Sequence, residues 1–230
     1  MKNCCIIVAG GSGSRMGAEI PKQFLQIGGI PILMHTIQNF YDFDKSLKLI
    51  LVLPAEEILN WNELCHQHHF EIQHQVIAGG ETRFQSVKNG LSLATECKLI
   101  AVHDGVRPLV SHDTLTRCFS CAAEKGTAIP VLPANESVRE GSMIESVPVD
   151  RSRFFLVQTP QVFKASILQK SYNQNFIPEF TDDASVVEHD GITVQLVMGN
   201  RENIKITFPE DLKIAELLLH PKPLQGYKTT

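Results

Sequence analysis

The chain has 230 residues, 43% of them hydrophobic, and a formal net charge of −4 at neutral pH. This balance gives no long-range attraction to polyanions, so we expect no nucleic-acid or membrane partner, and an anionic ligand needs a local cluster of cations. The length and apolar content support one substantial core, and no run of 18 apolar residues predicts a transmembrane helix. Six cysteines do not make a disulfide framework in a chain of this size, so we expect reduced thiols and a cytoplasmic protein.

The first predicted element is a buried strand that runs into a glycine-rich loop. An apolar run over residues 4–9 leads into Gly10-Gly11-Ser12-Gly13-Ser14-Arg15-Met16-Gly17, and Pro21-Lys22-Gln23 follows. Glycines let backbone N–H groups approach a polyphosphate, and Arg15 and Lys22 add cations at its rim. The loop matches neither common nucleotide motif, because no Lys follows its last glycine and Met16 stands where a dinucleotide loop needs a third Gly.

Further along the chain, apolar runs alternate with helical segments, which predicts an α/β fold with a mostly parallel sheet and helices on both faces. The predicted strands cover residues 47–53, 76–78, 99–103, 128–132, 154–157 and 194–198. Helices are predicted over 55–68 after Pro54, over 112–125 between a Ser111 cap and a Gly126 stop, and over 210–219 after Pro209. Ligands bind at the carboxyl ends of such strands, so the loops after Ala9, Ala78 and His103 should share one crevice.

The segment 135–150 interrupts this alternation. Two short, half-apolar stretches flank Glu140-Gly141-Ser142, which predicts a protruding hairpin. An isolated two-stranded arm is marginally stable in water, so we expect it to pack against another surface such as a second subunit.

Cations recur beside glycines and predicted loop boundaries, at Arg15, Lys22, Arg83, Arg107, Arg151, Arg153 and Lys205. Any one of them is as readily a solvated surface charge. Gathered on one crevice rim, they suit phosphoryl or nucleotidyl transfer, which depends mainly on positioning and charge neutralisation.

Two acidic segments are candidate ligands. Asp104 ends a predicted strand, and a single carboxylate beside phosphates suits Mg²⁺; the alternatives are a turn cap or an ion pair with Arg107. Asp182 and Asp183 follow Thr181, where they are equally consistent with the first turn of a helix and with substrate binding.

Seven segments together closely resemble the 2-C-methyl-D-erythritol 4-phosphate cytidylyltransferase family. In chain order they are Gly10-Gly11-Ser12-Gly13-Ser14-Arg15-Met16, Pro21-Lys22-Gln23-Phe24, His103-Asp104-Gly105-Val106-Arg107-Pro108, Asp150-Arg151, Thr159-Pro160-Gln161, Thr181-Asp182-Asp183-Ala184-Ser185 and Asn203-Ile204-Lys205-Ile206-Thr207. The resemblance implies transfer of CMP from CTP to methylerythritol phosphate, giving 4-diphosphocytidyl-2-C-methylerythritol and pyrophosphate in non-mevalonate isoprenoid synthesis. It also implies Mg²⁺, and a Rossmann-like sheet of the nucleotide-diphospho-sugar transferase type in one domain over 1–230. Segment 135–150 would be the arm of a homodimer.

The resemblance also implies roles for individual residues. Arg15 and Lys22 would stabilise charge on the α-phosphate, and Arg151 and Lys205 would hold the incoming sugar phosphate. Asp104 would lie near the nucleotide and the metal. The nucleotide pocket would be shaped by Ala9, Gly10, Gly11, Gly13, Gly79, Gly80 and Ser86, and the sugar-phosphate side by Arg107, Thr181 and Asp182.

The chain departs from the family pattern at Gly10, where many members have a second Ala. That variant also occurs in the related ribitol 5-phosphate cytidylyltransferases, which are the nearest alternative; Asp150-Arg151 and the segment 181–185 favour the erythritol enzyme. A nucleotide-binding regulatory module without turnover is the alternative from a different class. It would need the first glycine loop but not Arg151 or Lys205. A nucleotide-sugar pyrophosphorylase is a looser enzymatic alternative.

Overall fold

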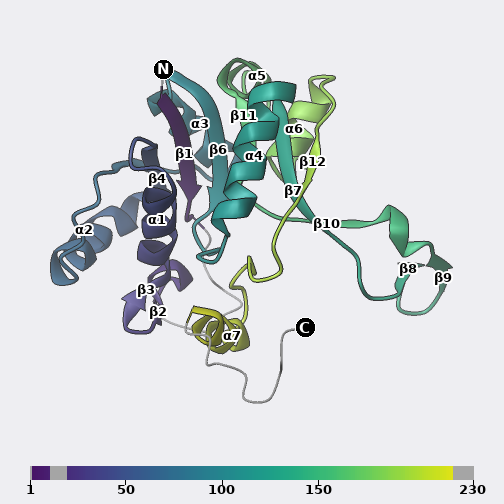
Figure 1. Cartoon of the computed structure of the whole chain (residues 1–230), viewed down its shortest axis with the longest axis horizontal. Helices are drawn as coiled ribbons and strands as arrows, with labels where there is room; N and C mark the ends of the chain where they lie inside the picture. The colour runs from purple at the N-terminus through teal and green to yellow at the C-terminus, as the bar shows by residue number, and fades with distance from the viewer. Residues whose placement is uncertain (1, 11–19, 220–230) are drawn as a thin grey trace, which may run out of the picture.

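One mixed sheet forms the centre of the molecule (Figure 1). The computed structural model describes residues 2–10 and 20–219. The strand order is β10-β7-β11-β6-β1-β4-β5, and β12 also pairs with β7. These strands are β1 (Lys2–Val8), β4 (Lys48–Leu53), β5 (Gln75–Ala78), β6 (Cys97–Asp104), β7 (Thr127–Pro133), β10 (Phe155–Val157), β11 (Gln161–Lys164) and β12 (Leu196–Met198). The strands β6, β1, β4 and β5 run parallel, whereas β11 is antiparallel to β6 and β7.

Strand β1 shows why the sheet is covered on both faces. Successive side chains of a strand point to opposite faces, and β1 is apolar at both sets of positions. Cys5 and Ile7 belong to one core cluster, and Cys4 and Ile6 belong to the other. The first cluster contains residues of α1 (Ile32–Phe43), α2 (Ile58–Gln67) and α4 (His112–Lys125). The second contains residues of α3 (Arg83–Leu93), α5 (Ala165–Ser171) and α6 (Asp183–His189), so the predicted α/β fold with helices on both faces is confirmed.

Local signals at the helix ends account for the predicted bounds. Helix α4 has the predicted range; the Ser111 side chain accepts a hydrogen bond from the Thr114 N–H (3.1 Å), and Gly126 ends the helix in the left-handed region at φ 100°. The helix predicted over 55–68 is divided into η3 (Ala55–Glu57) and α2. No helix within residues 2–10 and 20–219 has the length and apolarity needed to cross a membrane.

A third cluster lies near the carboxyl end of β6. Helix α7 (Pro209–Leu219) packs there beside the small hairpin of β2 (Gln26–Ile27) and β3 (Ile30–Pro31), which the sequence pattern does not predict. Its buried members are Ile27, Ile32, Val106, Ile206 and Ala215. Because the Ile206 N–H donates to the Val106 carbonyl (3.0 Å), this cluster holds the segment around Lys205 against the turn that follows β6.

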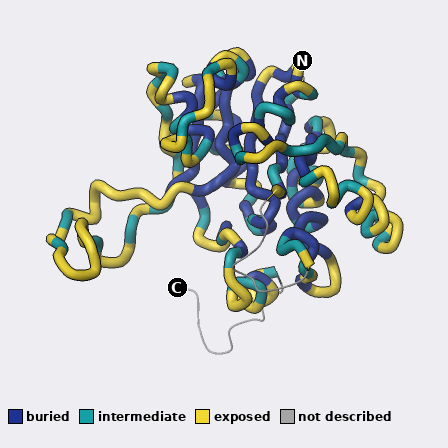
Figure 2. Tube along the Cα trace, turned by 180° about the vertical axis from the view of Figure 1, so that it is seen from behind, coloured by how far each residue is buried: buried dark blue, intermediate teal, exposed yellow. Residues whose placement is uncertain are grey.

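The predicted hairpin is present and projects from the body of the molecule (Figure 1). Strands β8 (Val138–Gly141) and β9 (Ser146–Val149) form their own two-stranded sheet, and η4 (Arg151–Arg153) follows it. Met143 and Ile144 at the tip are fully exposed, and Figure 2 shows most of the arm as exposed.

One pair of cysteines differs from the expectation of reduced thiols. Cys4 and Cys97 form a disulfide between β1 and β6, with their Cα atoms 5.8 Å apart, while Cys5, Cys65, Cys118 and Cys121 are free thiols. The pairing gives no sequence signal because the two residues are 93 positions apart and meet only when the two strands pair.

Candidate active site

A cavity of about 220 Å³ lies at the carboxyl ends of β1 and β6. This is the edge at which an open parallel sheet binds its ligands. Its lining residues come from five separate segments of the chain: Val8, Ala9, Gly10, Lys22, Gln23, Gly80, Glu81, Thr82, Arg83, Ser86, Asp104, Val106 and Lys205.

Closely packed backbone joins the ends of β1, β4 and β6 beside the cavity. The Ala9 N–H donates to the Val52 carbonyl (2.9 Å), and the Gly105 N–H donates to the Val8 carbonyl (2.8 Å). A Cβ atom at Gly105 would lie 2.9 Å from the Ala9 Cβ, so the approach of these two segments requires glycine at 105.

Ser86 holds the second glycine loop in shape. Its hydroxyl accepts a hydrogen bond from the Gly80 N–H (3.1 Å) and donates to the Thr82 carbonyl (2.9 Å). A Cβ at Gly79 would lie 2.8 Å from the Ser86 Oγ, so the loop and this hydroxyl fit only with glycine there. The Thr82 side chain then caps α3 by accepting from the Gln85 N–H (3.1 Å).

Asp104 is surrounded by three cations. Its Oδ2 lies 3.0 Å from the Lys205 Nζ and 3.2 Å from the Arg107 Nε, and its Oδ1 lies 3.8 Å from the Arg83 Nε. Burial works to raise the pKa of Asp104, but the charges of Arg83, Lys205 and Arg107 outweigh it and hold that pKa far below its ordinary value. The cluster keeps a net positive charge after this pairing, which favours an anionic ligand.

Arg107 serves the site from behind the cavity wall. Besides its contact with Asp104, it donates from Nη1 to the carbonyl of Asn203 (2.8 Å), and its side chain is only 12% exposed. It thereby joins the turn after β6 to the segment that carries Lys205. The ion pair between Asp104 and Arg107 is one of the two alternatives to a metal site that the sequence left open for Asp104.

A chain of hydrogen bonds fixes the backbone of Asp104. The Asp104 N–H donates to the Thr159 hydroxyl (3.1 Å), which lies 3.1 Å from the His103 Nδ1, and the His103 Nε2 lies 2.9 Å from the Arg107 carbonyl. Because a carbonyl can only accept, Nε2 carries the proton and Nδ1 accepts from Thr159. Burial lowers the pKa of His103 to about 4, although the Arg107 carbonyl acts in the opposite direction.

The cavity brings together part of the site predicted from the sequence. Among the described residues, those that line it are Ala9, Gly10, Lys22, Gly80, Ser86, Asp104 and Lys205. Gly79 precedes Gly80 in the same loop and is not among the lining residues. Arg15, Gly11 and Gly13 lie outside the described residues.

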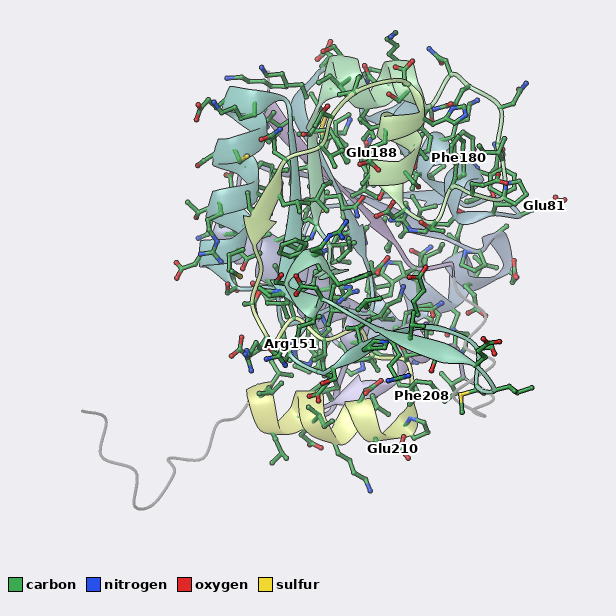
Figure 3. The ribbon with its side chains drawn as sticks, turned by 90° about the vertical axis from the view of Figure 1, so that its right-hand side faces the viewer. Glu81, Arg151, Phe180, Glu188, Phe208 and Glu210 are labelled. Carbon is green, nitrogen blue, oxygen red and sulfur yellow. A yellow bond between two sulfur atoms is a disulfide. The ribbon has the colours of Figure 1, made fainter. Side chains whose placement is uncertain are left out.

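Arg151 lies elsewhere, at the base of the arm. It is exposed in η4, its Nη1 donates to the carbonyl of Asn135, and it is not among the residues that line the cavity. In Figure 3 it is well separated from Glu81, which does line the cavity.

Thr181 and Asp182 also lie outside the cavity lining. Thr181 is exposed, and Asp182 is the N-cap of α6, where its Oδ1 accepts from the Ser185 N–H (2.9 Å) and its Oδ2 from the Gln161 amide (2.7 Å). Asp182 and Asp183 therefore begin a helix, and their role in substrate binding stays a prediction.

Arg83, which the sequence predicted only as one of several cations beside loop boundaries, has a larger part in the site than its pattern indicated. It is the first residue of α3, lines the cavity and pairs with both Asp104 and Asp183. The sequence signal was its position two residues after Glu81, which follows the glycine pair Gly79-Gly80. Its buried partner lies 100 positions away and could not be read from the pattern.

The predicted magnesium site does not fit the contacts of Asp104. Both carboxylate oxygens already face cations, and these three cations would repel a further positive ion. Within the described part of the chain, no three or more His, Cys, Asp or Glu side chains are grouped as metal ligands. Asp104 is thus the counterion of a cation cluster.

Comparisons with known proteins show the family of the chain. The family model of 2-C-methyl-D-erythritol 4-phosphate cytidylyltransferase (IspD) matches residues 3–221. The chain belongs to this family.

Relatives with that name include one from Bacteroides fragilis, 53% identical over 95% of this chain and 100% of the relative, and one from Porphyromonas gingivalis, 49% identical over 95% and 98%. The crystal structure of 4-diphosphocytidyl-2C-methyl-D-erythritol synthase from Anaerococcus prevotii is 25% identical, with a TM-score of 0.80 over 95% of this chain and 96% of that one. The enzyme from Thermus thermophilus is 31% identical, with a TM-score of 0.77 over 95% and 98%. The cavity is therefore the candidate active site of a nucleotidyltransferase.

Proposed function

We propose that this protein transfers CMP from CTP to 2-C-methyl-D-erythritol 4-phosphate, releasing pyrophosphate and forming 4-diphosphocytidyl-2-C-methyl-D-erythritol for isoprenoid synthesis. The observation that carries the proposal is the cation cluster of Lys22, Arg83 and Lys205 on one cavity at the carboxyl edge of the sheet. Membership of the cytidylyltransferase family supplies the base and the sugar alcohol.

The reaction needs charge neutralisation more than proton transfer. A phosphate oxygen of the acceptor attacks the α-phosphorus of CTP, a new P–O bond forms, and the bond to the bridging oxygen of the β-phosphate breaks as pyrophosphate leaves in line. The nucleophile is already an anion, so the step requires no general base. The difficulty is to bring two anions together, which fixed cations in a cavity make possible.

Within the cavity, the two substrates have different walls. Gly10, Gly80 and Ser86 form a backbone-rich wall for the nucleotide, and Lys22 adds charge for the α-phosphate, with Arg15 by resemblance. Lys205, which lines the cavity and pairs with Asp104, is proposed to hold the acceptor phosphate. The small glycine residues allow close approach of the nucleotide, whereas the cations orient the attacking oxygen.

We propose that Mg²⁺ is required and is bound by the nucleotide triphosphate rather than by Asp104, whose oxygens are engaged by cations. Activity should be lost in excess EDTA and return with added Mg²⁺. The Mg²⁺ concentration for half-maximal rate should be the same for the wild type and Asp104→Asn. A large increase of this concentration in the variant would show that Asp104 binds the metal. Full activity in EDTA would contradict the requirement itself.

The arm and Arg151 support a proposed homodimer. We also propose that the protein is cytoplasmic and that residues 1–230 form a single domain. Arg151 lies on the exposed base of an arm whose apolar tip has no cover in one chain. If Arg151 holds the acceptor phosphate, the arm of a second chain would have to bring it to the cavity. The arm 135–150 is thus proposed as the dimerisation element.

Pyrophosphate release tests the proposed activity. The protein is mixed with CTP and Mg²⁺ and with methylerythritol phosphate, ribitol 5-phosphate or no acceptor, and the nucleotide product is identified by mass. We expect release only with an acceptor, and mainly with methylerythritol phosphate. Binding of CTP without turnover in every mixture would favour a regulatory module instead.

A further inference from the structure

Asp183 is a fully buried carboxylate that holds Arg83. The Arg83 Nη1 donates to the Asp183 Oδ1 (3.0 Å), and Nη2 donates to Oδ2 (2.6 Å). This two-pronged contact fixes both the position and the plane of the guanidinium. Asp183 follows the N-cap of α6, and Arg83 begins α3, so the pair joins the starts of two helices on one face of the sheet.

Tyr172 fixes Asp183 in turn. Its hydroxyl donates to the Asp183 Oδ1 (2.7 Å), and its ring is almost completely buried. The ring also stacks on Phe84, the residue after Arg83, with centroids 4.7 Å apart and planes at 16°. Burial, and then the charge of Asp183, raise the pKa of Tyr172 well above its ordinary value, so the hydroxyl remains a hydrogen-bond donor throughout the physiological range.

Two carboxylates therefore compete for one guanidinium. Asp183 takes both terminal nitrogens at hydrogen-bond distance, whereas Asp104 is left at 3.8 Å from Nε. The Arg83 side chain is 29% exposed and lines the cavity. Without Asp183, the nearest strong acceptor for Arg83 is Asp104, and a closed pair with it would neutralise the wall on which the acceptor phosphate should bind.

We propose that Asp183 and Tyr172 are positioning residues that hold the Arg83 guanidinium on the cavity wall beside Asp104, where its positive charge faces the acceptor phosphate instead of closing on Asp104. The inference rests on the proposed transferase function and adds Arg83 to the acceptor side of the site. It assigns a function to the buried pair beyond the anchoring of α3 to α6.

The kinetic test uses variants that differ only in the positioning contacts. Asp183→Asn keeps the shape and removes the charge, and Tyr172→Phe removes only the hydroxyl. Asp190→Asn is the matched control, because Asp190 accepts from Ser171 (3.2 Å) and pairs with Lys170 (3.1 Å) at the other end of α6, with no contact to Arg83. Rates are measured at a temperature at which every variant is folded by circular dichroism.

We expect Asp183→Asn to raise KM for methylerythritol phosphate by about tenfold or more while KM for CTP changes by less than about twofold. Tyr172→Phe should have the same pattern with a smaller effect. In the Asp183→Asn background, Tyr172→Phe should have no further effect, since it acts through Asp183. Arg83→Lys should resemble Asp183→Asn, because an ammonium cannot make the two-pronged contact.

A second measurement does not depend on turnover. In the full chain without substrates, the Nη–H resonances of Arg83, which donate to Asp183, are assigned by their loss in Arg83→Lys, and their hydrogen exchange is followed by NMR. Exchange should be slow in the wild type and in Asp190→Asn, and faster in Asp183→Asn. Should Asp183→Asn not fold, Tyr172→Phe gives the same comparison with a smaller increase.

The outcomes separate the explanations. Equal exchange of Arg83 in the wild type and in the folded positioning variants would overturn the inference. A parallel rise in KM for both substrates, together with a lowered melting temperature, would also overturn it. That result would mean that Asp183 and Arg83 only anchor α3 to α6. A wild-type protein that releases no pyrophosphate would contradict the proposed function, and the exchange of Arg83 would still decide whether Asp183 positions it.

Discussion

At the scale of single residues, Lys205 and Arg107 share one oxygen of Asp104 but have different surroundings. Lys205 is 42% exposed and lines the cavity, whereas Arg107 is 12% exposed and donates to the carbonyl of Asn203. An exposed cation can exchange its contact with Asp104 for a contact with phosphate, since both partners are anions. A buried cation with a second backbone partner would lose that hydrogen bond as well as its contact with Asp104.

The first prediction concerns Lys205. Lys205→Ala should raise KM for methylerythritol phosphate by about tenfold or more and lower kcat, because the attacking phosphate loses both affinity and orientation. CTP binding without acceptor, measured by calorimetry, should change by less than about twofold. Lys213→Ala on the exposed face of α7 is the matched control and should leave both substrates unaffected. An equal loss of CTP affinity in Lys205→Ala would place this lysine on the nucleotide side.

The second prediction concerns the stability that Asp104 contributes. Asp104→Asn removes the carboxylate that pairs with Lys205 and Arg107, whereas Arg83 keeps Asp183, so the free energy of unfolding in urea at pH 7 should fall by about 3 kcal/mol. Because the pKa of Asp104 is lowered in the folded state, its contribution is complete above its ordinary value near 4 and is lost as the pH falls below that value. The difference between wild type and variant should therefore shrink below about pH 4. A difference that stayed constant down to pH 3 would show that Asp104 acts through packing alone.

At the scale of elements, the junction between β6 and β11 depends on a neutral histidine. His103 is the last residue but one of β6, and Thr159 precedes β11, so their hydrogen bond joins the strand that carries Asp104 to its antiparallel neighbour. Protonation of Nδ1 would remove the acceptor for the Thr159 hydroxyl and place a charge in the core.

The third prediction is the pH dependence of this junction. The pKa of His103 is about 4 in the folded protein against an ordinary value of 6.5, so the unfolded chain binds the proton first as the pH falls. The wild type should lose roughly 3 kcal/mol of stability between about pH 6.5 and pH 4, at 1.36 kcal/mol per pH unit of difference. His103→Gln should be less stable at pH 7 but should lose less between those pH values. Parallel urea-unfolding profiles for the two proteins would contradict this assignment.

The sequence predicted those elements whose signals are local. The apolar run at β1, the cap and stop of α4, and the turn between β8 and β9 each depend on neighbouring residues, and all three elements are present. Strand β11 was not predicted because only Val162 and Phe163 of its four residues are apolar, and β2 and β3 have two residues each. Short strands give too few positions for an alternating pattern to be recognised.

The candidate site was predictable to the extent that strand ends and glycines mark it. Asp104 follows a buried strand, and Gly10 and Gly80 follow two others, so their convergence is expected from the sheet. The contact between Arg83 and Asp183 joins residues 100 positions apart, and the disulfide of Cys4 joins residues 93 apart. Such partners are set by the tertiary packing, which no local pattern records.

At the scale of the whole molecule, the arm has apolar side chains that one chain leaves exposed. Val147 in β9 is exposed, and Met143 and Ile144 at the tip are fully so, although hydrophobic residues on a two-stranded arm gain stability only when covered. The body of the molecule, by contrast, has its own core on both faces of the sheet. Removal of the arm should therefore leave the fold intact.

The fourth prediction follows from this contrast. Replacement of residues 135–146 by a short Gly-Ser turn should give a folded monomer in sedimentation velocity, where the wild type sediments as a dimer. Activity with methylerythritol phosphate should fall much more than CTP affinity, because Arg151 remains in the chain but is no longer delivered to a partner. A variant that stays dimeric would place the interface elsewhere, and a fully active monomer would remove the need for Arg151 of a second chain.

The most direct test of the central claim is the choice of acceptor. In the unmodified protein with saturating CTP and Mg²⁺, kcat/KM is measured by pyrophosphate release for methylerythritol phosphate and for ribitol 5-phosphate. We predict that methylerythritol phosphate is preferred by at least roughly a hundredfold, about 2.7 kcal/mol in transition-state binding. A preference for ribitol 5-phosphate would contradict the substrate assignment, and pyrophosphate release that needs no acceptor would contradict the transfer itself.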